Sequence, residues 1–212
     1  MSLTSLPAAR PGGEAGRRER ILEAAERVFA ARGFHVATMQ DVADGAGMSP
    51  GNLYRTFPSK EAIVEGLCAR DQQERAANFA KVGQVESVMA AFAAGLREHV
   101  VSRPRAKARL MVEIWAEAAR NPAIAAMSRA VDADILTQIE HMIEIAKQRG
   151  EASPSVNSAS VARYIFTYVS GLLQRVACNP EFDAEAEGER AFGLFKALCE
   201  GRLAPVGTET LR

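Results

Sequence analysis

The abundance of alanine is the feature that most constrains the fold of this chain. Alanine occupies 39 of the 212 positions, whereas aromatic residues make up only 6%. Alanine is the best helix former, because it loses no side-chain rotamer freedom in a helix. Runs in which Val, Ile, Thr and Tyr alternate with polar residues, which are typical of strands, are absent from the sequence. The sequence therefore predicts an all-helical protein.

Composition excludes several classes of protein. The 26 Lys and Arg residues balance 26 Asp and Glu residues, and 48% of the residues are hydrophobic, as in an ordinary globular protein. No uncharged stretch approaches the roughly 18 apolar residues of a membrane span. The first residues lack the basic start and apolar run of a secretion signal. We therefore expect a cytoplasmic protein that does not enter a membrane.

The cysteines indicate neither a disulfide framework nor a zinc site. Cys68, Cys178 and Cys199 lie far apart, and no Cys or His stands at metal-binding spacing from them. We expect them to be small apolar residues on helix faces, with a redox-sensing thiol as the alternative. The sequence predicts no metal and no cofactor.

Helical spacing and capping residues divide the chain into about nine helices. Residues 1–16 contain several Pro and Gly residues and are expected to form a flexible arm. A first helix begins at Arg17 and ends at Gly33, which suits a cap with positive φ. Two short helices follow, and longer ones are expected over residues 60–79, 84–101, 104–119, 122–149, 158–178 and 184–202.

The segment over residues 38–57, TMQDVADGAGMSPGNLYRTF, carries the strongest local signal. Thr38 with Asp41 three residues later is a variant of the capping box that opens a helix. Gly47 provides a turn, and Ser49–Pro50 starts a second short helix. This helix-turn-helix pattern presents its second helix to the major groove of DNA. The alternative is a helical corner whose polar exposed residues have no such role.

The side chains expected on the outside of the second short helix suit contacts with DNA. They are hydrogen-bonding types, and an Asn can pair with adenine and an Arg with guanine. Helix N-termini offer N–H groups to phosphates. Gly51 lets the backbone approach the duplex, and Lys60 can hold a flanking phosphate. The exposed candidates are Ser49, Asn52, Tyr54, Arg55 and Thr56.

This part of the chain resembles the TetR family of transcriptional regulators. The resemblance rests on a first helix ending in ARGF, on Thr38, and on GAGMSPGNLYRTFPSKEAI, in which LYRTFPSKE is highly specific. It is clear over residues 17–67. It implies a DNA-binding domain of three helices over residues 17–60 and a larger helical domain for regulation and dimerisation over residues 61–212.

The resemblance also implies roles for single residues. Arg17 and Arg18 are further candidates for phosphate contacts, and Arg55 could instead pair with an acid on the neighbouring helix. Positions that contact phosphates in the family are matched by Thr38, Ser49, Tyr54 and Lys60. Positions that meet bases or the groove wall are matched by Gln40, Pro50, Gly51, Asn52, and Arg55 or Thr56.

Partners are implied in the same way. Members of the family bind double-stranded DNA operators as homodimers, usually repress transcription, and release DNA when a small molecule binds the larger domain. The last two long helices would form a four-helix dimer interface, with packing inside one subunit as the alternative for some of their residues. The candidate dimer contacts are Tyr164, Tyr168, Leu172, Phe192, Phe195 and Leu198.

A small-molecule effector of unknown identity is expected among the central helices. Methionine adapts to irregular shapes and suits a pocket for flat or apolar compounds. Glu113 and Glu117 are polar groups on otherwise apolar helices that could orient a ligand, as could a histidine. The alternative is a place in the plain core and, for His141, a surface or hydrogen-bonded structural role. The expected lining residues are Met89, Phe92, Met111, Ile114, Trp115, Met127, His141 and Met142.

Two functions from other classes stay open. One is a DNA-binding architectural or interaction module without small-molecule control. The other, a helical enzyme, is less favoured, because HExxH, GxGxxG, P-loop and GxSxG motifs are absent. Residues 1–60 hold 8 basic and 6 acidic residues, whereas residues 61–212 hold 18 and 20, which agrees with DNA binding by the first part. The basic run over residues 103–109 is either a solvated face or a second phosphate-facing patch.

Overall fold

The computed structural model describes residues 13–80, 84–102 and 105–203, and the regular structure within them is helical. Nine α-helices occur in these residues, and a π-helix, η2, continues α5, so the predicted all-helical fold is confirmed. The bounds are α1 Glu14–Arg32, α2 Met39–Gly45, α3 Pro50–Thr56, α4 Lys60–Phe79, α5 Val88–Leu96, η2 Arg97–Ser102, α6 Arg105–Ala118, α7 Pro122–Gln148, α8 Ser158–Cys178 and α9 Ala184–Cys199.

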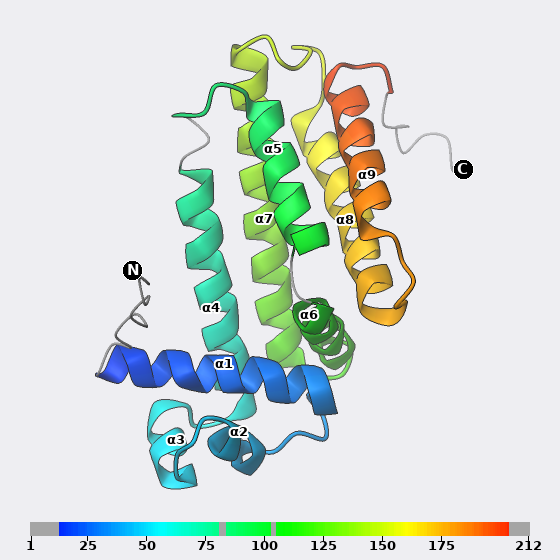
Figure 1. Cartoon of the computed structure of the whole chain (residues 1–212). Helices are drawn as coiled ribbons and strands as arrows, with labels where there is room; N and C mark the ends of the chain where they lie inside the picture. Colours follow the sequence, from blue (N-terminus) through cyan, green and yellow to red (C-terminus); the bar gives the residue numbers. More distant parts are fainter. Residues whose placement is uncertain (1–12, 81–83, 103–104, 204–212) are drawn as a thin grey trace, which may run out of the picture.

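The helices form a crossing layer and an upright bundle (Figure 1). α1 runs across one end of the upright helices, and the short α2 and α3 lie beyond it at the extreme end of the molecule. α4 leads from this end along the bundle of α5, α7, α8 and α9, while α6 lies beside one end of α1. The candidate DNA-binding helices therefore occupy one pole of the molecule.

Two clusters of buried residues correspond to these two parts. The N-terminal core, which includes Phe29 of α1, also takes in Leu110 of α6 and Ile124 of α7. The C-terminal core is built by α5 to α9 and contains the stacked rings of Phe92 and Phe195, whose centroids are 3.6 Å apart. Because Leu110 and Ile124 belong to the N-terminal core, α6 and α7 pack directly onto the DNA-binding end.

Most of the predicted helix caps are present. The Thr38 side chain accepts the Asp41 N–H, and the Asp41 carboxylate accepts the Thr38 N–H, which completes the capping box of α2. Gly33 ends α1 with a φ of 81°. The Ser59 side chain caps α4. Ser49 stands at the N-cap of α3 as predicted, but its side chain makes no capping hydrogen bond.

Several helix ends differ from the sequence prediction. α1 begins at Glu14, before the expected start, and the charge of Glu14 in the first turn suits the helix dipole. α5 begins at Val88 because Ser87 caps it and the Glu151 carboxylate accepts the Val88 N–H at 3.0 Å. η2 forms the last part of the helix expected over 84–101. α9 ends before the turn that contains a positive-φ glycine.

Some expectations fall outside the described residues. These are most of the arm over residues 1–16, the expected helix start at residue 104, and Arg103 of the basic run. In the part of the chain that is described, no helix combines the length and the apolar character needed to cross a membrane.

Candidate DNA-binding surface

The turn between α2 and α3 is built as the sequence predicts. Gly47 has a φ of 65°, and a Cβ there would meet no atom within 4 Å, so the requirement for glycine is conformational. The Met48 N–H closes the turn on the carbonyl of Ala43 at 3.0 Å. Val42 of α2 and Leu53 of α3 are fully buried. These contacts fix the two short helices to each other and to the N-terminal core.

α3 presents an open polar surface to solvent. Gly51 has ordinary negative φ, and a Cβ there would meet no atom within 4 Å, so neither strain nor packing requires glycine. The missing side chain leaves backbone accessible on the outer face of the helix. Tyr54 is 51% exposed. We call this the α3 surface, made of Ser49, Pro50, Gly51, Asn52, Tyr54, Arg55 and Thr56.

Several polar side chains of α3 and α2 are hydrogen-bonded within their own helices. The Arg55 guanidinium donates to Asn52 Oδ1, so the partner of Arg55 is not an acid on the neighbouring helix. The Thr56 hydroxyl donates to the Asn52 carbonyl at 3.4 Å. On α2, Gln40 Nε2 donates to Asp44 Oδ1 at 2.8 Å. To contact bases, these side chains would have to exchange their hydrogen bonds within the helices for hydrogen bonds to DNA.

Thr38 is engaged at the start of α2. Its hydroxyl donates to Asp41 Oδ2 at 2.7 Å, and Arg32 forms an ion pair with the same carboxylate. The hydrogen bonds from Thr38 lower the pKa of Asp41 below its ordinary value, and the Arg32 charge adds to this. A phosphate contact by the Thr38 hydroxyl would therefore compete with Asp41.

Lys60 has a structural role that the sequence did not reveal. Its ammonium donates to the carbonyl oxygens of Phe34 at 2.8 Å, His35 at 3.2 Å and Ala37 at 2.8 Å. It also lies 4.7 Å from the centroid of the Phe34 ring. All the N–H donors of an ammonium group are used in this arrangement. The expected phosphate contact of Lys60 would require it to leave this turn.

Glu113 of α6 holds the same turn through another hydrogen bond. Its Oε2 accepts the Phe34 N–H at 3.0 Å, across 79 positions of sequence. We call Lys60 and Glu113, which hold residues 34–37 between them, the turn clamp. Since Glu113 belongs to α6, the clamp attaches the larger part of the chain to the loop before α2. Glu117, the other candidate ligand-orienting acid of α6, is buried and accepts from Arg120 at 2.9 Å.

A close helix approach supports the DNA-binding end, and the sequence pattern did not predict it. A Cβ on Gly66 of α4 would lie 2.8 Å from Phe57 Cε1 and 3.0 Å from Leu22 Cδ2. The Arg18 guanidinium also lies at this contact, 3.1 Å from that Cβ position and 4.5 Å from the centroid of the Phe57 ring. Arg17 and Arg18 are both exposed, and Arg18 also packs its guanidinium against Phe57. A lone glycine inside a helical pattern was the signal for this contact.

The described residues of the basic run 103–109 are mostly engaged. Lys107 Nζ lies 2.9 Å from Asp71 Oδ1, and Arg105 donates to the Pro180 carbonyl at 3.1 Å. Arg109 is exposed. Because Lys107 and Arg105 already have partners within the chain, the run is poorly suited to form a second phosphate-facing patch.

The thiols and acids suggest no metal centre. Among the described residues, no group of three or more His, Cys, Asp or Glu side chains is placed to hold a metal ion. Burial raises the pKa of Cys199 to about 12 and also raises the pKa of the half-buried Cys68, which disfavours both thiolates. Cys178 is exposed.

The expected effector-lining residues are distributed over both cores. Phe92 and Met142 are buried in the C-terminal core, and Met89 packs against it. Ile114 and Met127 pack against the N-terminal core. Met111 and Trp115 of α6 are half-buried, and His141 is exposed. The structure does not gather the eight around one common cavity.

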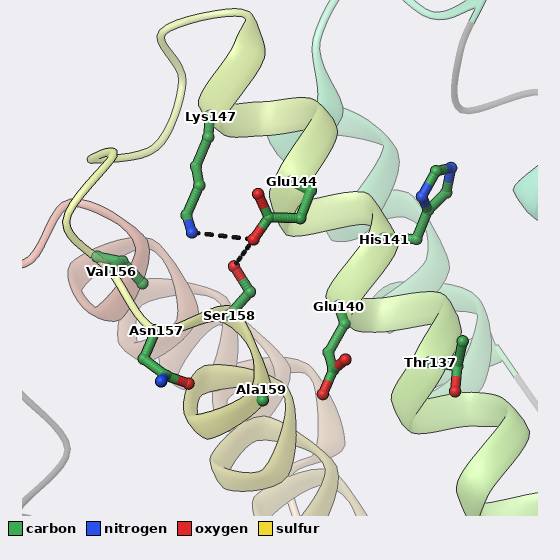
Figure 2. A pocket seen from close by; sticks show the side chains of 9 residues that line it. All are labelled: Thr137, Glu140, His141, Glu144, Lys147, Val156, Asn157, Ser158 and Ala159. Carbon is green, nitrogen blue, oxygen red and sulfur yellow. Dashed lines mark hydrogen bonds and ion pairs between the residues drawn. The ribbon is translucent and has the colours of Figure 1, made fainter.

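A surface hollow of about 570 Å³ lies between α7 and the start of α8 (Figure 2). Of the expected effector residues it contains only His141, which points away from the other polar groups. Glu144 accepts from Ser158 and from Lys147, and these hydrogen bonds lower its pKa. The polar, internally paired wall differs from the largely apolar lining of an effector pocket.

The six candidate dimer contacts divide by burial. Leu172, Phe195 and Leu198 are at most 6% exposed and belong to the core of their own chain. They have almost no surface left for a partner, so the alternative of packing within one subunit applies to them. The candidates that reach the surface are Tyr164, which is 46% exposed, and the half-buried Tyr168 and Phe192.

Two family models match the chain. One, described as bacterial regulatory proteins of the tetR family, matches residues 21–67. The other, described as the C-terminal part of BetI-type transcriptional repressors, matches residues 85–200. The first match contains the α3 surface, and the second spans α5 to α9.

Individual proteins match over most of the chain. The HTH-type transcriptional regulator UidR of Escherichia coli strain K12 is 33% identical over 189 residues, which are 88% of this chain and 92% of that protein. The structure of Salmonella enterica GusR has a TM-score of 0.74 at 28% identity and covers 87% of this chain and 95% of its own. A TetR-family regulator from Rhodococcus sp. has a TM-score of 0.76 at 25% identity, covering 86% and 98%.

Proposed function

Because the chain belongs to the TetR family of bacterial transcriptional regulators, we propose that it is a homodimeric repressor that an effector releases from a palindromic operator. Family membership makes it a DNA-binding regulator with a ligand-binding C-terminal domain rather than an enzyme. The observation that carries the proposal is the α3 surface, an open polar helix at one pole of the molecule.

We assign DNA reading to residues 17–60, and regulation and dimerisation to residues 61–212. Within the α3 surface, Asn52, Arg55 and Thr56 contact bases, and Gln40 of α2 does so beside them. Pro50 and Gly51 lie against the groove wall, where Gly51 permits close approach. The exposed Tyr54 and the hydroxyl of Ser49, which makes no capping hydrogen bond, contact phosphates. Thr38 and Lys60 contribute to DNA binding mainly through hydrogen bonds within the chain, which hold the start of α2 and the loop before it in place.

We assign dimerisation to α8 and α9. Tyr164, Tyr168 and Phe192 leave apolar or aromatic surface outside the chain's own core. A two-fold dimer through these helices would carry two α3 surfaces to successive major grooves, which recur every 34–36 Å on one face of DNA. Such a dimer reads a palindrome, as symmetric readers of DNA do.

We assign effector control to the contacts that join the two parts. α4 runs from the DNA-binding end into the bundle, and the turn clamp ties α6 to the loop before α2. An effector lowers operator affinity if it binds more tightly to a form in which the two α3 surfaces are wrongly spaced. Acting on bacterial operators, the protein works in the cytoplasm.

Selection of bound DNA from a random pool tests this function. The proposal expects enrichment of a palindrome whose half-sites lie about one helical turn apart. Enrichment of a site without two-fold symmetry would contradict the homodimer. Enrichment of no sequence at all would support an architectural module instead.

A further inference from the structure

The interior between α4 and α7 holds a cation that is incompletely paired. Arg75 lies in α4, and its side chain is only 12% exposed. Its Nε and Nη2 atoms are buried and have no hydrogen-bond partner among the described residues. Asp134 of α7 places Oδ2 3.8 Å from Nη2, which is an ion-pair distance but too long for a hydrogen bond.

Arg70 on the same helix has both terminal nitrogens of its guanidinium hydrogen-bonded, although its Nε, like that of Arg75, is buried without a hydrogen-bond partner among the described residues. Its Nη1 donates to Glu19 at 2.8 Å, and its Nη2 donates to Glu26 at 2.7 Å. Two carboxylates thus hold the fork of Arg70 with short, charge-assisted bonds. Arg75 lacks such bonds, although burial makes them more valuable.

Gln138 of α7 places a second unused group at the same point. Its Nε2 donates to Asp134 Oδ2 at 3.0 Å, the oxygen that faces Arg75. Its Oε1 is buried and has no hydrogen-bond partner among the described residues. The side chains of Arg75 from α4 and Gln138 from α7 therefore meet at one carboxylate oxygen, and each keeps buried polar atoms without a partner among the described residues. Such groups call for a partner.

We propose that Arg75 and Gln138 bind a small organic hydroxy acid, with Arg75 holding its carboxylate and Gln138 Oε1 accepting from its hydroxyl. This inference rests on the proposed function, because it gives the chemical class of the effector. The planar fork of Arg matches a carboxylate. The hydroxyl is required because Gln138 Oε1 needs a donor, which an ionised carboxylate lacks. A doubly charged phosphate would place more negative charge beside Asp134 than a carboxylate does.

The position of this site connects it to the DNA-binding end. Arg75 lies on α4 and Gln138 on α7. The same two helices are also joined at their N-terminal ends, where the N-cap residue of α7, Asn121, donates to Glu61 of α4 at 3.3 Å. A ligand held by both helices fixes their relative position. α4 begins directly after α3, so this constraint reaches the α3 surface.

Binding of matched acids and amides to the full-length protein tests the proposal. The probes are 3-hydroxybutyrate, gluconate and 4-hydroxybenzoate, each compared with its primary amide by calorimetry. We expect at least one acid to bind about tenfold or more tightly than its amide, because only the acid pairs with the Arg75 charge. Arg75→Met should remove this preference, while Arg129→Met, at an exposed position of α7, should keep it. No acid binding better than its amide, or an unchanged preference in Arg75→Met, would overturn the proposal.

Two further readouts distinguish ligand binding by Arg75 from a purely structural role. Without ligand, Arg75→Met should unfold within about 2 °C of the wild type, whereas a purely structural ion pair predicts a larger loss. Arg75→Met should also bind the selected palindrome as the wild type does. Release of DNA by a neutral amide would leave the proposed function intact and overturn the hydroxy-acid site. Failure of the wild type to bind any DNA selectively would instead remove the proposed function.

Discussion

Asn52 offers a direct test of base reading at the residue scale. It is half-buried, lies on α3, and its side-chain oxygen accepts from Arg55. Asn52→Ala should change the preferred base at one position of each half-site, by about 1–3 kcal/mol, because one bidentate contact carries that much discrimination. Anisotropy titrations against single-base variants of the operator measure this. Gln73→Ala, at an exposed position of α4, is the control. An equal loss on every sequence would remove Asn52 from the base-reading residues.

Tyr54 tests the phosphate contacts. Tyr54→Phe deletes only a hydroxyl from a side chain that is 51% exposed, so the fold should be unchanged. We expect weaker binding of all DNA sequences by about 0.5–1.5 kcal/mol, the worth of one hydrogen bond. The slope of affinity against salt should stay the same, because a neutral hydroxyl releases no counterion. A loss confined to one operator sequence would show that Tyr54 reads a base.

Gly66 tests the packing beneath this surface. Gly66→Ala would place a Cβ 2.8 Å from Phe57 and 3.0 Å from Leu22, so we expect a loss of about 1–3 kcal/mol in unfolding free energy from overpacking. Gly95→Ala is the matched control, since Gly95 is an exposed helical position with nothing within 4 Å. That change should raise stability by up to about 1 kcal/mol. Urea unfolding that ranks the two variants in the opposite order would contradict the close contact.

At the scale of elements, sequence reasoning succeeds where the determining contacts are local. The capping box of Thr38 spans three residues, and Gly47 acts through its own φ, so both can be read directly from the chain. The roles of Lys60 and Glu113 depend on contacts with Phe34, which lies 26 positions from Lys60 and 79 positions from Glu113 in the sequence. No pattern in one sequence shows that these two side chains meet at the same turn. The DNA-binding residues were therefore predicted, whereas the turn clamp that holds the loop before α2 was not.

The turn clamp makes a prediction for the loop between α1 and α2. Lys60→Met should lower the unfolding free energy by about 1–3 kcal/mol, because the carbonyls of residues 34–37 lose a charged donor. Urea denaturation measures this, and operator affinity should fall with the loss of order before α2. Unchanged stability together with a shallower salt dependence of DNA binding would instead assign Lys60 to a phosphate.

The start of α5 predicts a dependence of stability on pH. Burial alone would raise the pKa of Glu151, but hydrogen bonds from Val88, Ser87 and Met89 lower it below its ordinary value of 4.5. A lowered pKa in the folded state means that the contribution to stability is present above pH 4.5 and is lost as the pH falls through the folded value. The difference in unfolding free energy between wild type and Glu151→Gln should therefore shrink from pH 7 toward pH 3. A difference that grows on acidification would contradict this account.

At the scale of the whole molecule, the sequence could not separate buried core residues from residues that reach the surface. Leu172 and Phe195 recur at the same helical spacing as Tyr164 and Phe192, yet the first pair is buried in the chain's own core and the second pair reaches the surface. Only the angle at which α8 and α9 pack on the bundle decides between them. Fold class and helix order were predictable, because they follow from periodicity and caps.

A charged substitution on the surface of α8 should convert the proposed dimer into monomers. Tyr164→Glu adds a charge to a side chain that is 46% exposed, so the single chain should remain folded. We expect the change to disrupt the proposed dimer, because an unpaired charge buried in an interface is costly. Analytical ultracentrifugation should show a lower mass than for the wild type. Gln148→Glu, at the exposed end of α7, should leave the mass unchanged. A Tyr164→Glu dimer of wild-type stability would place the interface elsewhere.

Binding to a half-altered operator tests the central claim most directly. The selected palindrome is compared with a version in which one half-site is scrambled, by anisotropy with full-length protein. A homodimer that reads both half-sites through its α3 surfaces should lose several kcal/mol, since mismatched base pairs cost about 1–3 kcal/mol each. Equal affinity for the two DNAs would contradict symmetric, sequence-specific reading by a dimer.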